Sequence, residues 1–288
     1  MSTIDTAPPR PATGLQGTGE LAGIVLDWTP VPWETVVDHY ALYAAEDADD
    51  VAVEDATLLA KTVYPHAQHR GLGGTARRWV YRVVTVDAAG TRSRPSKPIT
   101  VTSQESVTVS GTPVAVVGEF DGKGLELALS PDGYARYTQT FPDGVDFRHG
   151  ADDPATGWSY LHPGPADGWA GRREHRFRLR FPLDEAPADD VDLALWLIDS
   201  HASIPGSAVL KVNGTTVDRL EFAGGATKGS LQGDSTVPGS PLRPSYVERA
   251  LPADLFVPGE NVLELHKDDG SWIAYDAVGV FARPPAHE

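Results

Sequence analysis

Short runs in which apolar and polar residues alternate, separated by turns, recur along most of this sequence. In the first hundred residues three such runs are bounded by Gly, Pro or Asp: Ile24, Leu26 and Trp28; Tyr40, Leu42 and Tyr43; and Trp79, Tyr81 and Val83, followed by Val84 and Val86. Alternation with a period of two places every second side chain on one face of a strand. Such runs, spaced by turns, are typical of an antiparallel sandwich.

The same pattern continues after a polar stretch near residue 110. We expect further strands over 125–129, 134–141, 175–181, 191–198, 208–212, 217–222, 245–251, 262–265 and 273–281. The last two flank Lys267-Asp268-Asp269-Gly270, whose residues tolerate the left-handed backbone of a tight hairpin turn. Many short strands with few helical patterns predict two sheets packed face to face, as in a jelly roll.

Length and composition favour two all-β domains. The chain has 288 residues, which suits two domains of this kind, and its 29 Gly and 24 Pro favour turns over long helices. We expect a disordered lead over residues 1–16, a first domain over 17–103, a linker over 104–112 and a second domain over 113–284.

Charge and cysteine content narrow the function classes. The formal net charge of −16 repels phosphate backbones and anionic membranes, so we expect neither nucleic acid nor membrane as a partner. The absence of cysteine excludes disulfides, thiol nucleophiles and cysteine-bound metal centres. The first 16 residues lack the basic and apolar regions of a signal peptide. We therefore expect secretion only as part of a larger exported protein, and a cytoplasmic location otherwise.

Three segments of the first hundred residues carry a resemblance. They are APPRPATGLQGTGELAGIVLDWTP, DHYALYAAE and WVYRVVTVDAAGTRSRPSKPITVT. Together they resemble a fibronectin type III domain, with Trp28 at the position of that family's core tryptophan on the second strand. In bacterial carbohydrate enzymes such a domain usually spaces or braces its neighbour, so the resemblance implies a structural role for this half.

A second resemblance covers most of the remaining chain. It is carried by VVGEFDGKG, by WSYLHPGPADGWAGRREHRFRLRFPL and by AVLKVNGTTV with YVERALPADLFVPGENVLELHKDDGSWIAYDAVGVF. These segments are similar to the carbohydrate-binding-like C-terminal domain of rhamnogalacturonan lyases, a galactose-binding-like jelly roll that also follows a fibronectin-like domain. The catalytic domain of those lyases has no counterpart here. The resemblance therefore implies a non-catalytic accessory protein for pectin-like or other uronide-rich polysaccharide, with a catalytic partner chain as a candidate partner.

The densest group of candidate ligand-binding residues lies in a Gly- and Pro-rich loop. Its members are Trp158, Tyr160, His162, Asp167 and Trp169. A sugar presents apolar C–H faces and hydroxyl edges, so its site needs an aromatic plane beside hydrogen-bonding groups. The alternative interpretation is that these aromatic residues pin the loop to the core.

Three further residues are candidates for the same site. Asp199 and His201 follow the strand expected over 191–198 and would lie at a loop rim, or simply form a solvated turn. Trp272 follows the turn at Asp268–Gly270 and is either a stacking platform or a core residue. All three belong to the ligand-binding hypothesis.

Other function classes remain open from the sequence. A stand-alone polysaccharide lyase or glycoside hydrolase would use His162, His201, Tyr160 and Arg172, since β-elimination needs a base and a cation that neutralises the uronate. A structural or protein-interaction module is the third hypothesis. Calcium is a candidate cofactor, held by loop carbonyls with Glu119, Asp121 or Asp276, because Ca²⁺ prefers oxygen ligands.

Overall fold

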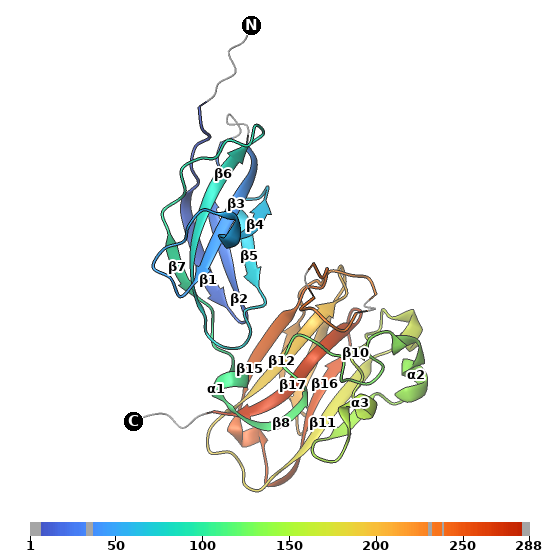
Figure 1. Cartoon of the computed structure of the whole chain (residues 1–288). Coiled ribbons are helices and arrows are strands. Elements are labelled where there is room, and N and C mark those ends of the chain that lie inside the picture. The colour runs from blue at the N-terminus through green and yellow to red at the C-terminus, as the bar shows by residue number, and fades with distance from the viewer. Residues whose placement is uncertain (1–6, 33–36, 230–231, 238, 284–288) are drawn as a thin grey trace. The chain divides into compact units, whose positions relative to one another are not determined.

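The structure is a computed structural model that describes residues 7–32, 37–229, 232–237 and 239–283. The chain divides into two compact units, Met1–Ser106 and Val107–Glu288 (Figure 1). Both are built from β-strands, which confirms the all-β fold class predicted from the alternating pattern. Within the described ranges, no helix has the length and apolar character that crossing a membrane requires.

Unit 1 is a sandwich of two antiparallel sheets. One has the order β1-β2-β5 and the other β4-β3-β6-β7. The strands are β1 (Thr13–Glu20), β2 (Gly23–Thr29), β3 (Val37–Glu46), β4 (Leu58–Thr62), β5 (His66–Arg70), β6 (Arg78–Asp87) and β7 (Ile99–Thr102). In β2 the alternating residues Ile24, Leu26 and Trp28 all point into the core between the sheets, as their spacing requires.

Unit 2 is a second, larger sandwich. Its first sheet has the order β10-β17-β12-β15, with β8 also paired to β17, and its second has the order β14-β13-β16-β11-β9. The strands are β8 (Thr112–Gly118), β9 (Val145–Arg148), β10 (Leu161–His162), β11 (His175–Leu183), β12 (Val191–Ser200), β13 (Ser207–Val212), β14 (Thr215–Glu221), β15 (Ser245–Leu251), β16 (Gly259–Lys267) and β17 (Ile273–Ala282). In Figure 1, β8 and β17 lie side by side although they stand at opposite ends of the unit's sequence.

Burial explains the sequence of each strand in unit 2. In β11, Phe177, Leu179 and Phe181 are buried in the core, whereas the arginines between them face outward. Strands β12 and β17 are buried almost throughout, which fits their nearly continuous apolar sequences. One face of the first sheet packs on the sandwich core, and on its other face Trp196 is covered by the rings of Phe120 and Tyr246.

The prediction of a hairpin around Lys267-Asp268-Asp269-Gly270 is wrong. Strand β16 pairs with β11 and β13, whereas β17 pairs with β12, β8 and β10, so the turn passes from one sheet to the other. The buried ammonium group of Lys267 fixes this crossing by donating to the carbonyl oxygens of Pro205 and Asp269. Alternation shows which residues face the core, but it does not show which strand is the partner.

Two of the expected strands in unit 2 are not strands. Residues 125–129 form turns, and residues 134–141 form a 3₁₀ turn (Gly133–Arg136) that runs into helix α2 (Tyr137–Thr140). The aromatic residues there, Tyr134, Tyr137 and Phe141, follow i, i+3, i+7 spacing, which is the period of a helix. The other short helices are α1 (Val107–Ser110) and α3 (Pro154–Gly157).

The segments expected to be a lead and a linker contain ordered structure. Strand β1 already begins at Thr13, and Ala12 is buried in the core of unit 1; residues 1–6 lie outside the described residues. The amide of Gln104 donates to the carbonyl of Glu20 at 3.0 Å, α1 starts three residues later, and β8 begins at Thr112.

Candidate functional site

Most of the aromatic residues in the Trp158–Trp169 loop are buried. Trp158 is 1% exposed, and its ring packs edge-on against Phe177 and Tyr275, while Tyr160 is completely buried. A buried ring cannot stack on a sugar, so the ligand-binding interpretation of Trp158 and Tyr160 is replaced by core packing.

His162 is also completely buried. Its ring stacks on Phe177 with centroids 3.8 Å apart, its Nδ1 lies 2.9 Å from the hydroxyl oxygen of Tyr275, and its Nε2 lies 3.1 Å from the carbonyl oxygen of His175. The carbonyl can only accept, so Nε2 carries the proton and Nδ1 accepts from the tyrosine. Burial lowers the pKa of His162 well below its usual value. A neutral imidazole with both nitrogens engaged cannot act as a base on a substrate.

Trp169 is half-buried and packs against the core of unit 2. Its Nε1 donates to Oδ1 of Asp167 at 3.2 Å, and the edge of its ring meets Tyr134 and Tyr137 at centroid distances of 5.5 and 5.9 Å. Tyr134 is likewise half-buried. We name this pair of partly exposed rings, Trp169 and Tyr134, the aromatic rim. Tyr134 was missed from the sequence because residues 134–141 were assigned to a strand.

Asp167 organises the loop that carries the rim. It is buried, and besides the indole of Trp169 its carboxylate accepts from the amide of Gly164 at 2.9 Å and from the hydroxyl of Ser271. These bonds use the acceptor capacity of the carboxylate, so Asp167 positions Trp169 rather than a ligand. Arg172 is exposed beside this loop, and its own amide donates to the carbonyl oxygen of Asp167 at 3.0 Å.

Asp199 serves a different loop from the one expected. It is buried, and its carboxylate accepts from the amide of Ala226 and the hydroxyl of Thr227, both at 2.8 Å. His201 is half-buried and its Nδ1 accepts from the amide of Ile204 at 3.2 Å. Trp272 is buried and meets His201 edge-on, so it is a core residue rather than a platform.

Asp276 on β17 has a buried carboxyl group whose oxygens lack hydrogen-bond partners among the described residues. The residue is 1% exposed. Burial is the main cause that raises the pKa of Asp276 to about 8; the amides of Gly122 and Lys123 oppose this shift, and the nearby carboxylates of Asp121 and Glu126 add to it. The group is therefore protonated at neutral pH unless a cation replaces the proton.

Calcium fits these residues only in part. Asp276 offers a carboxyl group that a cation could deprotonate, but Oδ1 of Asp121 accepts from the amide of Lys123 and Oε1 of Glu126 accepts from the amide of Glu119, both at 2.9 Å. Glu119 itself is exposed. Among the described residues no three His, Asp or Glu side chains converge as a metal would require.

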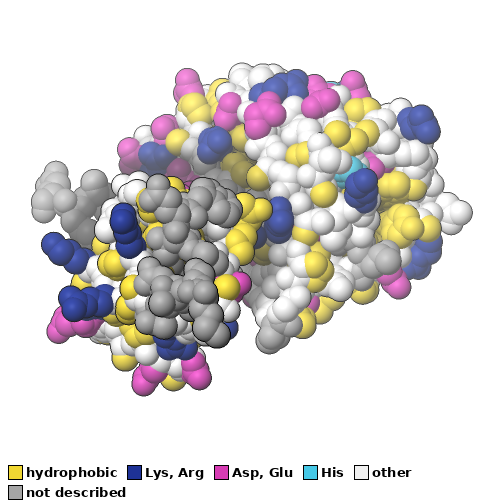
Figure 2. Space-filling model, turned by 90° about the horizontal axis from the view of Figure 1, so that it is seen from above, with side chains coloured by type: hydrophobic (Ala, Val, Ile, Leu, Met, Phe, Trp, Pro, Cys, Tyr) yellow, Lys and Arg dark blue, Asp and Glu magenta, His cyan; other side chains and the backbone are white. Residues whose placement is uncertain are grey.

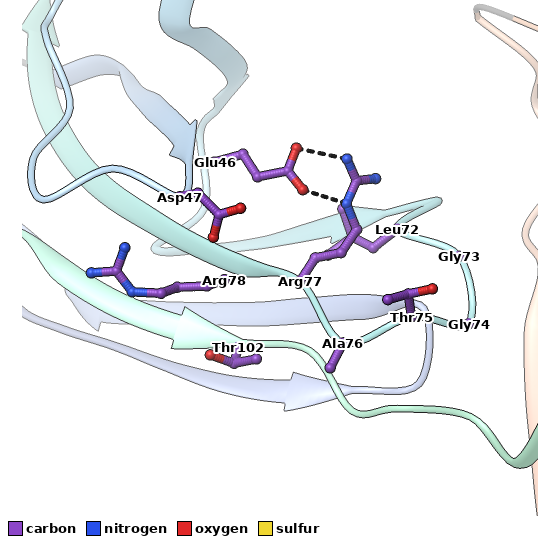
Figure 3. Close-up of a pocket in the computed structure, with 10 residues that line it drawn as sticks. All are labelled: Glu46, Asp47, Leu72, Gly73, Gly74, Thr75, Ala76, Arg77, Arg78 and Thr102. Carbon is purple, nitrogen blue, oxygen red and sulfur yellow. Dashed lines mark hydrogen bonds and ion pairs between the residues drawn. The ribbon is translucent and has the colours of Figure 1, made fainter. Parts of the chain in front are cut away.

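Described residues of unit 1 line two surface hollows, among others. The larger of these, about 490 Å³, is lined mainly by polar residues, among which Arg77 forms two hydrogen bonds with Glu46 (Figure 3). The smaller, about 390 Å³, is lined by His39, Lys61, Thr62, Val63 and Tyr64.

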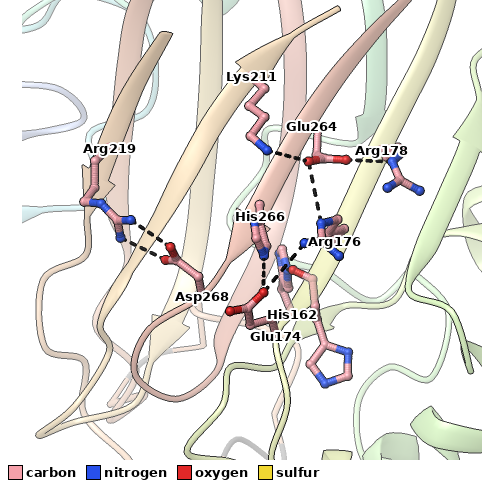
Figure 4. A network of polar contacts seen from close by, with 10 residues as sticks. His162, Glu174, Arg176, Arg178, Lys211, Arg219, Glu264, His266 and Asp268 are labelled. Atoms are coloured by element: carbon pink, nitrogen blue, oxygen red, sulfur yellow. Dashed lines mark hydrogen bonds and ion pairs between the residues drawn. The ribbon is translucent and has the colours of Figure 1, made fainter. Parts of the chain in front are cut away.

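The outward face of the β11–β16 sheet carries a paired charge network. Arg176, Arg178 and Lys211 converge on Glu264, and Glu174 bonds His266 at 2.9 Å (Figure 4). Acidic and basic side chains are also interspersed on the surface seen in Figure 2. Paired charges of this kind are typical of a solvated face rather than of a ligand site.

Comparisons with known proteins give only distant similarities. No protein-family model and no curated protein matches the sequence. A fibronectin type III domain of human fibronectin type III domain containing protein 3 is 15% identical, with 38% of this chain and 97% of that chain covered and a TM-score of 0.30. A family 35 carbohydrate binding module from an environmental isolate is 15% identical, covering 50% of this chain and 90% of that chain, with a TM-score of 0.27.

An α-L-rhamnosidase from Dictyoglumus thermophilum extends over more of the chain. It is 12% identical, and the match covers 96% of this chain but 29% of that enzyme, with a TM-score of 0.30. Solved structures similar to parts of the chain thus include fibronectin type III domains and a carbohydrate-binding module. At these TM-scores the similarities carry no argument about ligand or activity.

Proposed function

We propose that this chain is a non-catalytic glycan-binding protein that assists the degradation of a uronide-rich polysaccharide. The observation that carries the proposal is the aromatic rim. Trp169 is partly exposed, and its indole is fixed by Asp167, so no side-chain freedom needs to be lost when a sugar ring stacks on it. The exposed guanidinium of Arg172 lies on the same loop and suits a uronate carboxylate.

The pectin-like ligand and the accessory role come from the sequence resemblance to the C-terminal domain of rhamnogalacturonan lyases. In this proposal a separate catalytic chain cleaves the polysaccharide, and the present chain keeps it close to its substrate. Tyr160 and His162, two of the groups that a stand-alone lyase would use, are buried, so the structure favours binding over catalysis.

Calorimetric titration of the intact chain with oligogalacturonate and rhamnogalacturonan fragments tests the proposal. We expect Trp169→Ala to weaken binding about tenfold, which corresponds to ~1.4 kcal/mol. Trp169→Phe keeps an aromatic face but loses the bond to Asp167, so it should retain part of the affinity. Thermal unfolding of each variant controls for misfolding. Unchanged affinity in a folded Trp169→Ala protein would show that the aromatic rim does not bind the glycan.

A further inference from the structure

The turn between β4 and β5 presents an aromatic ring to solvent. Val63 and Tyr64 are 66% and 70% exposed. Among the large hydrophobic residues that the structure describes, Tyr64 is the one exposed aromatic residue. Isolated exposed apolar residues need no explanation, but here two adjacent ones border a hollow of about 390 Å³. The combination points to a binding surface.

The turn is fixed by its own hydrogen bonds. The amide of Tyr64 donates to Oγ1 of Thr62 at 3.0 Å, and the carbonyl oxygen of Pro65 accepts from the amide of Trp28 at 3.1 Å. Trp28 belongs to the core of unit 1, so the backbone that carries Tyr64 is anchored to the sandwich. A ring presented on a fixed backbone costs little entropy to engage.

The charged residues beside the ring favour an anion. Lys61 is exposed and has no acidic partner among the described residues. Nδ1 of His39 donates to the carboxylate of Asp38 at 2.7 Å, so this carboxylate is already engaged, and His39 itself lines the hollow. In a chain with a net charge of −16, an ammonium group that has no acidic partner within the described ranges, beside an exposed ring, favours an anionic ligand.

We propose that this hollow, lined by His39, Lys61, Thr62, Val63 and Tyr64, is a second glycan site and that it takes a carboxylated sugar, a hexuronate. The tyrosine ring stacks on the apolar face of the sugar, and the ammonium group of Lys61 pairs with the carboxylate. This inference rests on the proposed glycan-binding function but uses a separate unit of the chain. Two sites on one chain also increase the retention of a long polymer when both are engaged.

The test is a titration of the intact, ¹⁵N-labelled chain, followed by amide NMR, with oligogalacturonate and with its methyl ester. The ester keeps the sugar faces but removes the negative charge. We expect Tyr64→Ala to weaken binding of the acid at unit 1 at least fivefold. Lys61→Met, which keeps the apolar stem, should abolish the preference for the acid over the ester, and Lys61→Arg should restore it.

Controls separate this site from the aromatic rim. Lys97→Met removes another exposed cation of unit 1 and should leave binding unchanged. If Tyr64→Ala and Lys61→Met both bind the acid as the native chain does, the second site is refuted, whatever Trp169→Ala does. If Trp169→Ala is without effect while Tyr64→Ala weakens binding, the second site stands and the rim fails. If the native chain binds neither oligogalacturonate nor its methyl ester, both proposed sites are refuted.

Discussion

Asp276 lies on β17, which is buried almost throughout, and its protonation state follows from that position. An aspartate in the unfolded chain has an ordinary pKa near 3.9, whereas burial raises the pKa of Asp276 to about 8 in the folded protein. Between these two values the folded state binds one proton more than the unfolded state. Protonated Asp276 therefore makes its full contribution to the free energy of unfolding below pH 4, and this contribution is lost as the pH rises towards 8.

Replacement of this carboxyl group by an amide should remove that pH dependence. We expect the free energy of unfolding of the native chain in EDTA to lose ~2–3 kcal/mol between pH 5 and pH 7 through this group. The Asp276→Asn variant should lack this component, and denaturant unfolding at both pH values measures the difference. Equal slopes for the two proteins would show that Asp276 is ionised throughout.

The same two proteins test the calcium hypothesis. If Asp276 is a calcium ligand, millimolar calcium in place of EDTA will raise the Tm of the native chain and leave the Tm of Asp276→Asn unchanged. An equal response of both proteins would exclude Asp276 as a ligand.

Among the strands of unit 2, the outer face of the β11–β16 sheet carries several cationic side chains that meet at the carboxylate of Glu264. The side chain of Glu264 is 13% exposed, with Oε2 2.7 Å from Nε of Arg178 and Oε1 3.5 Å from Nζ of Lys211 (Figure 4). Arg176 lies 3.9 Å away. Three cations on neighbouring strands therefore converge on one carboxylate, although Arg176 also lies 3.6 Å from Glu174. This convergence makes the position of Glu264 more sensitive than an ordinary surface pair.

Substitution of Glu264 by Gln should destabilise unit 2 through repulsion among the cations that remain. We expect a loss of ~1–2 kcal/mol in the free energy of unfolding at low ionic strength, decreasing in 1 M salt because the repulsion is screened. Glu260→Gln is the matched control, since that side chain is 48% exposed and contacts Arg180 and Arg148 at 3.1 and 3.2 Å. A loss no larger than in the control would contradict the central role of Glu264.

The alternating pattern was sufficient to predict most strands but not how they pair. Buried strands such as β11, with Phe177, Leu179 and Phe181 inward, follow directly from a period of two. The pairing of β16 and β17 with different sheets could not be predicted, because the crossing depends on the tertiary contacts of Lys267. The helical spacing of Tyr134, Tyr137 and Phe141 was a usable signal that the strand assignment overlooked.

At the scale of the whole molecule, the sequence identified a loop rich in aromatic residues but not which of them reach solvent. Trp158 and Trp169 are the same residue type in the same Gly- and Pro-rich loop, yet Trp158 is in the core and Trp169 is partly exposed. The difference comes from residues distant in sequence, since Phe177 and Tyr275 enclose Trp158. Tyr64, in a short turn of unit 1, carried no motif that would have distinguished it.

We propose that the chain binds acidic glycans without cleaving them. The most direct measurement is a glycan-array screen of the intact chain in calcium and in EDTA, with absorbance of unsaturated uronide product read from the same wells. We expect retention on uronide-rich glycans, with no product formed. Product formation would replace the accessory role with a lyase in which His201 and Arg172 are the accessible candidates. Retention by no glycan at all would contradict the proposed function itself and favour a structural or protein-binding role.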